Sequence, residues 1–217
     1  IKKRIDKNWN PKIHEGSLSR YDEFEQIDMT SGEWLVLART KYMLNELEDT
    51  LYRKGYYYQN KFRKTKEQNL HTAAIDWEHL RQGQLLNHDQ LVKISSYMTI
   101  VKFDKQKIKG MAKGSFYGID QLIKDYGLNT KDPWFKAFND APGRDISYLR
   151  KMRINGEKLN QAPRIQLSTI HGAKGGESEN VVLLTDLSEN TMKAYERNAD
   201  DENRLFYVGA TRTKEHL

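Results

Sequence analysis

The chain has 217 residues and a formal net charge of +6, from 36 Lys and Arg against 30 Asp and Glu. It has no cysteine, which excludes a disulfide framework, Cys-ligated zinc, iron–sulfur clusters and thiol catalysis. Its longest aliphatic run, residues 181–184, is far shorter than the roughly 20 residues that span a bilayer, and no signal peptide begins the chain. We therefore expect a soluble protein of a reducing compartment, whose mild basicity permits nucleic acid as a partner without requiring it.

The first regular elements are expected in the first quarter of the chain. Residues 34–38 form a continuous apolar run after a Thr-Ser-Gly turn signal, which predicts a buried strand. Leucines then recur at helical spacing between residues 44 and 51, and Gly55 lies where such a helix is expected to end. A tyrosine-rich strand follows, so this segment reads as a β-α-β unit.

A basic run overlaps the end of that unit. Residues 53–66 contain six cations and no acid, with three tyrosines and one phenylalanine interleaved. Cations can neutralise phosphates while aromatic rings stack on bases, as single-stranded nucleic acid requires. The alternative is a solvated basic edge whose tyrosines pack against a neighbouring helix, and both interpretations remain open.

The middle of the chain is predicted to be mostly helical. Helices are expected over residues 72–81 and 89–100, with shorter ones around 118–126 and 133–138. No strand alternation is evident between about residues 66 and 161. Near the C-terminus a strand over 164–170, a glycine-rich loop, a buried strand over 181–184 and a helix over 200–212 follow one another. The pattern predicts an α/β domain with a parallel sheet covered by helices, interrupted by a helical insertion.

Two C-terminal segments carry residue types suited to phosphate chemistry. Residues 171–177 hold three glycines and a lysine after a predicted strand, and glycine lets main-chain amides approach a phosphate closely. This loop lacks the Gly-Lys-Ser/Thr ending of a Walker A motif, and a tight connection with an incidental lysine is an equal alternative. Arg212 closes an apolar helical stretch, where it can be a C-terminal charge that satisfies the helix dipole or a clamp for phosphoryl transfer.

Taken together, these segments resemble a known family. His-Gly-Ala-Lys-Gly-Gly-Glu at residues 171–177, followed by Glu-Asn-Arg-Leu-Phe-Tyr-Val-Gly-Ala-Thr-Arg-Thr at 202–213, resembles motifs V and VI of the UvrD/Rep-like superfamily 1 helicases. Residues 34–41 resemble the family's segment ending in Arg-Thr-Asn, with Lys41 in place of the Asn. The resemblance implies a RecA-like second motor domain (2A) formed by residues 1–66 and 161–217, with a 2B-like insertion at 67–160.

The resemblance also implies roles for individual residues. Arg212 would be the catalytic arginine finger that reaches the γ-phosphate of ATP, and Glu177 would accept a hydrogen bond from the nucleotide's ribose. The implied nucleotide-binding set is Lys174, Gly175, Glu177 and Arg212. The implied DNA-binding set is Arg39, Thr40, Lys41, Thr169 and His171. No metal ligand is expected in this chain.

The activity that follows is that of a C-terminal motor-domain fragment of an ATP-dependent DNA helicase that translocates on single-stranded DNA. The chain shows no Walker A lysine and no Asp-Glu magnesium site. ATP and Mg²⁺ would therefore be bound mainly by an N-terminal motor domain, which would be a partner alongside single-stranded DNA and single-strand/duplex junctions. The isolated chain is expected to be inactive as an ATPase, and its setting is expected to be DNA repair or replication in the cytoplasm of a bacterium or phage-infected cell. The alternatives are a non-catalytic RecA-like nucleic-acid-binding module and a nuclease-coupled recombination subunit of the same lineage.

Overall fold

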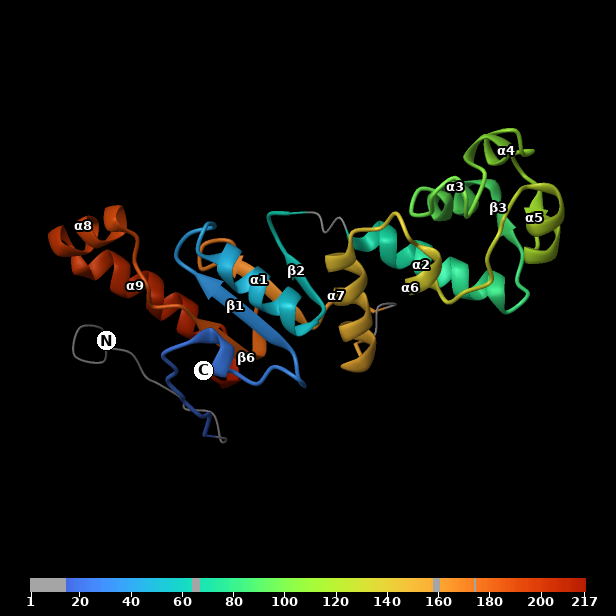
Figure 1. The fold of residues 1–217 in the computed structure, drawn as a ribbon. Helices are drawn as coiled ribbons and strands as arrows, with labels where there is room; N and C mark the ends of the chain where they lie inside the picture. The colour runs from blue at the N-terminus through green and yellow to red at the C-terminus, as the bar shows by residue number, and fades with distance from the viewer. Residues whose placement is uncertain (1–14, 64–66, 158–160, 174) are drawn as a thin grey trace. The chain divides into compact units, whose positions relative to one another are not determined.

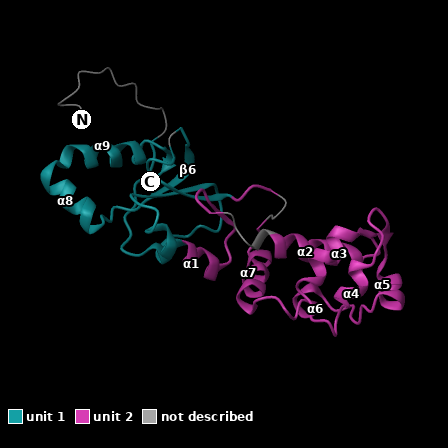
Figure 2. Ribbon diagram, turned by 90° about the horizontal axis from the view of Figure 1, so that it is seen from above, with its two compact units in different colours: residues 1–47, 164–217 teal, residues 48–163 magenta. Residues whose placement is uncertain are grey.

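The computed structural model describes residues 15–63, 67–157, 161–173 and 175–217. The chain forms two compact units, one made of residues 1–47 and 164–217 and the other of residues 48–163 (Figure 2). The first unit is thus assembled from both ends of the chain, and the second is continuous. These units are defined by packing alone. The assignment of residues 67–160 to a 2B-like insertion stays a prediction.

A mostly parallel sheet organises the fold (Figure 1). Strand β1 (Trp34–Ala38) lies between β5 (Ile165–Thr169) and β6 (Ser178–Leu183), and β7 (Thr213–His216) borders β6; these pairings are all parallel. With β2 (Tyr58–Asn60), the strand order is β2-β5-β1-β6-β7. The predicted α/β class with a parallel sheet is therefore confirmed. Strand β7 was not predicted, because three of its four residues are exposed and carry no apolar pattern.

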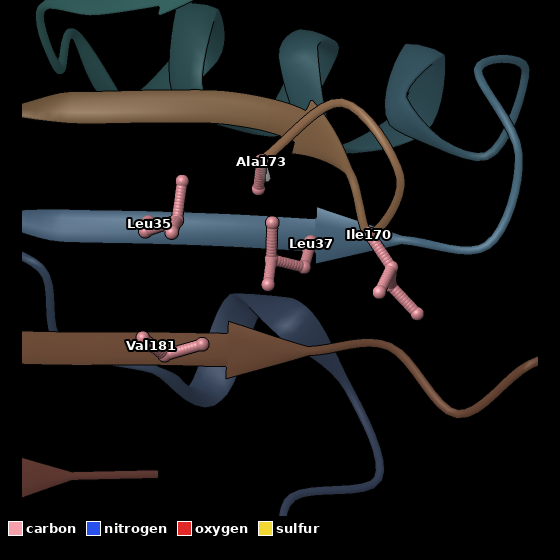
Figure 3. Close-up of a cluster of buried hydrophobic side chains, with 5 residues drawn as sticks. All are labelled: Leu35, Leu37, Ile170, Ala173 and Val181. Atoms are coloured by element: carbon pink, nitrogen blue, oxygen red, sulfur yellow. The ribbon is translucent and has the colours of Figure 1, made fainter. Parts of the chain in front are cut away.

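Both faces of β1 are buried. Leu35 and Leu37 point to one face, where they form a cluster with Ile170, Ala173 and Val181 (Figure 3). Helix α9 (Ala199–Ala210) packs on this cluster through apolar side chains of its middle turns. Successive strand residues alternate between faces, so Val36 and Ala38 point the other way, and both are completely buried. This double burial explains why the strand is a continuous apolar run instead of an alternating one.

Three further helical segments involve the first unit. A short 3-10 turn, η1 (Phe24–Gln26), precedes β1, and α1 (Leu44–Lys54) follows it. Helix α1 begins in the first unit with the buried Leu44 and Leu47, as its leucine spacing predicts. Helix α8 (Glu189–Arg197) begins where the Ser188 hydroxyl accepts a hydrogen bond from the Thr191 N–H at 3.2 Å. It buries none of its residues, so no apolar stripe revealed it in the sequence.

The second unit is mostly helical, as predicted. Its helices surround a core that includes Trp77, Phe103 and Phe138, and the Trp77 indole donates a 2.9 Å hydrogen bond to the Asp132 carbonyl. Strands β3 (Leu86–Asn87) and β4 (Phe116–Tyr117) pair antiparallel, and with two residues each they are too short to show strand alternation in the sequence. Its helices are α2 (Glu67–Arg81), α3 (His88–Ser95), α4 (Lys105–Lys109), α5 (Ile119–Asp125), α6 (Trp134–Ala137) and α7 (Gly143–Ile154).

Candidate functional site

The segments that follow β1 and β5 meet at one edge of the sheet, here called the carboxyl edge (residues 39–41 and 170–173). Ala38 and Thr169 are register partners, so the two parallel strands end at the same level. All five residues of the predicted DNA-binding set lie at or next to this edge, three after β1 and two at the end of β5. The fold thus brings together side chains that are about 130 positions apart in the sequence.

A bidentate ion pair fixes the first of these side chains. Arg39 donates from Nε to Glu202 Oε2 at 2.7 Å and from Nη2 to Glu202 Oε1 at 2.8 Å. The two side chains are 21% and 8% exposed. Glu202 belongs to the first turns of α9, so the pair joins that helix to the loop after β1. The sequence interpretation missed Glu202, because it lies in an acidic segment with Asp200 and Asp201 that reads as helix-dipole charge.

The charges of this pair support each other. Hydrogen bonds from Arg39 hold the pKa of the Glu202 carboxyl below its ordinary value, against the effect of burial. The same bonds raise the pKa of the Arg39 guanidinium. The nearby His171 makes a smaller contribution to the lowered pKa of Glu202. Both members of the pair are therefore ionised at neutral pH.

The other carboxyl-edge residues differ in exposure. Thr169 is buried, and its Oγ1 and carbonyl oxygen accept hydrogen bonds from Gly172 N–H at 3.0 Å and Ala173 N–H at 2.9 Å. Thr169 therefore shapes the turn that carries His171. The Thr40 hydroxyl is also buried, and it has no hydrogen-bond partner within the described ranges. Lys41 and His171 are exposed, so they are the accessible members of the set.

The two sheet strands β6 and β7 begin at the opposite edge, here called the amino edge (residues 175–177 and 211–212). The Ser178 N–H donates a 3.1 Å hydrogen bond to the Arg212 carbonyl, and Ser178 and Thr213 are register partners. Glu177 and Arg212, each one residue before its strand, are consequently neighbours. The Arg212 Nε donates to the Val208 carbonyl at 3.1 Å, so the guanidinium is anchored on the last turn of α9, as the helix-end alternative anticipates.

Two connections join these edges. The loop from β5 to β6 runs from the carboxyl edge to the amino edge, and Ala173 fixes it to the core (Figure 3). Lys174, which is the lysine of this loop predicted to bind the nucleotide, lies outside the described residues. Gly175 is exposed with φ +85°, a backbone conformation that favours glycine. The second connection is formed by α9 and the two residues after it, from Glu202 at the carboxyl edge to Arg212 at the amino edge.

The packing of α9 explains how it makes this connection. A Cβ at Gly209 would lie 2.9 Å from Leu183 Cδ1 and 3.5 Å from Ile170 Cγ2, so the helix approaches the sheet closely there. With a rise of about 1.5 Å per residue, the eight steps from Glu202 to Ala210 span roughly 12 Å. Residues 202–210 of α9 therefore extend over about this length along the sheet.

The basic run at residues 53–66 belongs to the second unit, where its described part is tied into packing. Tyr56 and Tyr58 are buried, and the Tyr148 hydroxyl donates a 2.8 Å hydrogen bond to the Tyr56 carbonyl. Arg63 pairs with Glu48 at 3.2 Å, while Lys64 and Lys66 lie outside the described residues. The alternative of tyrosines packed against a helix therefore holds for Tyr56 and Tyr58. A cavity of about 340 Å³ nearby is lined by Asp49, Tyr52, Arg53, Arg144, Ser147, Tyr148 and Lys151.

The sheet and the helices that flank it define the fold class of this chain. A mostly parallel five-stranded sheet flanked by helices is an α/β fold consistent with a RecA-like domain. The model of the UvrD-like helicase C-terminal domain matches residues 17–217. The chain therefore belongs to the UvrD-like helicase C-terminal domain family, which confirms the resemblance to UvrD/Rep-like helicases. No curated protein and no solved structure gave a match.

No helix among the described residues is long and apolar enough to cross a membrane. Within the same part of the chain, no group of three or more His, Asp or Glu side chains is arranged to hold a metal ion.

Proposed function

We propose that this chain is the second motor domain of an ATP-dependent DNA helicase that translocates on single-stranded DNA. In this proposal the carboxyl edge binds the DNA backbone, and the amino edge faces a nucleotide. Family membership supports the helicase assignment, and the separation of the two candidate residue sets onto opposite edges supports the division of labour. The observation that carries the proposal is the adjacency of Glu177 and Arg212 at the amino edge.

The carboxyl edge has the chemistry that a DNA backbone requires. Lys41 and His171 are exposed there, and Arg39 is partly exposed beside them. Cationic side chains neutralise phosphates independently of sequence, which suits a motor that must move along any strand. Thr40 and Thr169 have buried hydroxyls, so in this proposal they shape the edge and contribute main-chain groups.

The amino edge has the chemistry that a nucleotide requires. An arginine anchored on the last turn of a helix can present its remaining N–H groups to a γ-phosphate without reorganisation, which stabilises charge in the transition state. The exposed Glu177 carboxylate can accept a hydrogen bond from a ribose hydroxyl. The described residues hold no magnesium cluster, so Mg²⁺ and most contacts to ATP are assigned to a partner motor domain that carries Walker A and Walker B motifs.

Movement follows if the cleft between the two motor domains closes on ATP and reopens after hydrolysis. Arg212 responds to the γ-phosphate, and the carboxyl edge then moves relative to the partner domain. ATP thus biases a two-state element, and repeated cycles step the DNA edge along one strand.

The proposal is tested by Arg212→Ala in the intact helicase that contains this chain. Loss of an arginine finger is expected to lower ATP turnover by about 10³-fold or more while single-strand binding persists. Arg204→Ala, which removes an exposed arginine from the preceding helix α9, is the matched control and should retain turnover. ATP turnover that survives Arg212→Ala would contradict the finger assignment and favour the non-catalytic nucleic-acid-binding module.

A further inference from the structure

We propose that Glu202 is a positioning residue for DNA binding, which holds the Arg39 guanidinium so that its remaining N–H groups face a backbone phosphate. The inference rests on the proposed function, because it assumes that the carboxyl edge binds single-stranded DNA. It adds to that function a residue that itself makes no contact with DNA.

The geometry of the ion pair supports this role. A guanidinium carries five N–H donors in a rigid planar fork, and Glu202 engages two of them, one from Nε and one from Nη2. The three donors that Glu202 does not engage lie in the same plane, one on Nη2 and two on Nη1, and point away from the Nε side that Glu202 occupies. Because the fork is rigid, fixing one side also fixes the direction of the other. The Arg39 side chain remains 21% exposed, so part of it reaches the surface.

The surroundings of Glu202 make the pair a permanent feature of the fold. Its side chain is only 8% exposed, and a carboxylate enclosed to that extent stays charged only when it is paired. Glu202 therefore does not exchange Arg39 for solvent when DNA arrives. Arg39 keeps one orientation, and DNA binding avoids the entropy cost of ordering a long side chain.

Two other roles for Glu202 predict different effects of its removal. If Glu202 only neutralises Arg39, removing its negative charge beside a DNA surface should strengthen DNA binding. If it only stabilises the fold, its removal should weaken binding whether or not Arg39 is present. A positioning role predicts that removing Glu202 weakens binding only when Arg39 is present. The sign of the effect on binding and its dependence on Arg39 therefore distinguish all three roles.

The experiment measures binding of this chain to fluorescently labelled oligo(dT) by anisotropy over a series of salt concentrations. The proteins are wild type, Glu202→Gln, Arg39→Ala and the double variant. Glu202→Gln should weaken binding by about 5- to 10-fold and reduce the salt slope by about one, as Arg39→Ala does. The double variant should bind no more weakly than Arg39→Ala alone. Asp201→Asn, an exposed acid one residue earlier on α9, is the matched control and should bind as the wild type does or slightly more tightly.

A second variant covers the possibility that Glu202→Gln does not fold. Glu202→Asp keeps the charge but withdraws it by one methylene, so the unfolding temperature should stay near that of the wild type while DNA affinity falls several-fold. The inference is overturned if Glu202→Gln binds as tightly as the wild type, or if it weakens binding equally in the Arg39→Ala background. Absence of wild-type binding to single-stranded DNA would instead overturn the DNA part of the proposed function.

Discussion

The main-chain hydrogen bond from Ser178 to the carbonyl oxygen of Arg212, 3.1 Å long, brings the two candidate nucleotide segments together. It lies at the start of β6 and β7, so the residue before each strand is held by the sheet and not by a free loop. Arg212 is further fixed by its bond to the Val208 carbonyl. Motifs V and VI of the family therefore meet in this chain through main-chain pairing of parallel strands.

Replacing Glu177 tests the nucleotide side of this arrangement. A ribose contact is made equally in the ground state and the transition state, so Glu177→Ala in the intact helicase should raise the KM for ATP with little change in kcat. We expect a rise of about 5- to 10-fold for the loss of one charge-assisted hydrogen bond. Steady-state ATP hydrolysis at saturating single-stranded DNA measures both constants.

The matched control for that experiment is Glu179→Ala. Glu179 is also exposed and lies two residues further along, within β6, where it is not next to Arg212. An equal rise in KM for both variants would assign the effect to lost negative charge, and the ribose contact would be wrong.

Replacing Arg39 tests the stabilising effect of the buried ion pair. Arg39→Ala leaves the Glu202 carboxylate enclosed without its bidentate partner, which should lower the free energy of unfolding by about 2–4 kcal/mol. Arg39→Lys should recover only part of this, because an ammonium cannot form the two parallel bonds. Urea unfolding followed by circular dichroism measures the difference.

A surface pair supplies the comparison. Arg63 pairs with Glu48 at 3.2 Å, but the Arg63 side chain is 61% exposed, so Arg63→Ala should cost less than about 1 kcal/mol. Similar losses for Arg39→Ala and Arg63→Ala would show that burial of Glu202 does not strengthen the pair.

Acidification should remove the contribution that ionised Glu202 makes to the free energy of unfolding. Its folded-state pKa lies below the unfolded value of about 4.3, so the unfolded chain binds more protons in this range. The contribution is therefore fully present above about pH 4.3 and is lost as the pH falls through the folded pKa. The free energy of unfolding of the wild type should decline more steeply on acidification than that of Glu202→Gln.

A second carboxyl group, that of Asp132, also has a lowered pKa, so its effect on acid unfolding must be separated from that of Glu202. The pKa of Asp132 is also lowered, first by a hydrogen bond from Thr130 and then by Lys102. Because Asp132 is present in both proteins, the difference between the wild-type and Glu202→Gln curves isolates Glu202. Parallel curves between about pH 3 and pH 6 would contradict the prediction.

Elements whose buried residues follow a local pattern can be predicted from the sequence. Strands β1, β5 and β6 and helix α1 were predictable because their buried residues follow a run or a helical period. Glu177 and Arg212 were found because they belong to specific motifs. Glu202 begins the second of these motifs, but no role was predicted for it, since its burial depends on how α9 packs against the sheet and an acidic first turn gives no sign of that.

The surroundings of the tyrosines in the basic run and of Thr169 also depend on the tertiary fold. Tyr56 and Tyr58 are spaced to alternate in a strand, which fits either a base-stacking surface or a packed one, and only the tertiary fold shows that both are buried. Thr169 lies next to the exposed His171, but as the last residue of β5 it turns its hydroxyl toward the following loop. Side-chain direction at a strand end is set by the sheet and cannot be read from the motif.

The turn that ends α1 lies close to α7. Gly55 has φ +78°, and a Cβ there would overlap the Lys151 Cβ and lie 2.9 Å from the Lys151 carbonyl carbon. Gly55→Ala therefore combines backbone strain of about 1–2 kcal/mol with a clash against α7 that a flexible side-chain end cannot relieve. Gly156 has nearly the same dihedral, φ +72°, but nothing lies within 4 Å of its Cβ position. Gly156→Ala should lower the free energy of unfolding only by the backbone strain. Thermal unfolding should show that Gly55→Ala lowers it by at least about 2 kcal/mol more than Gly156→Ala does. Equal losses would mean that α7 moves away without cost, and the close packing of Gly55 against Lys151 would not stabilise the second unit.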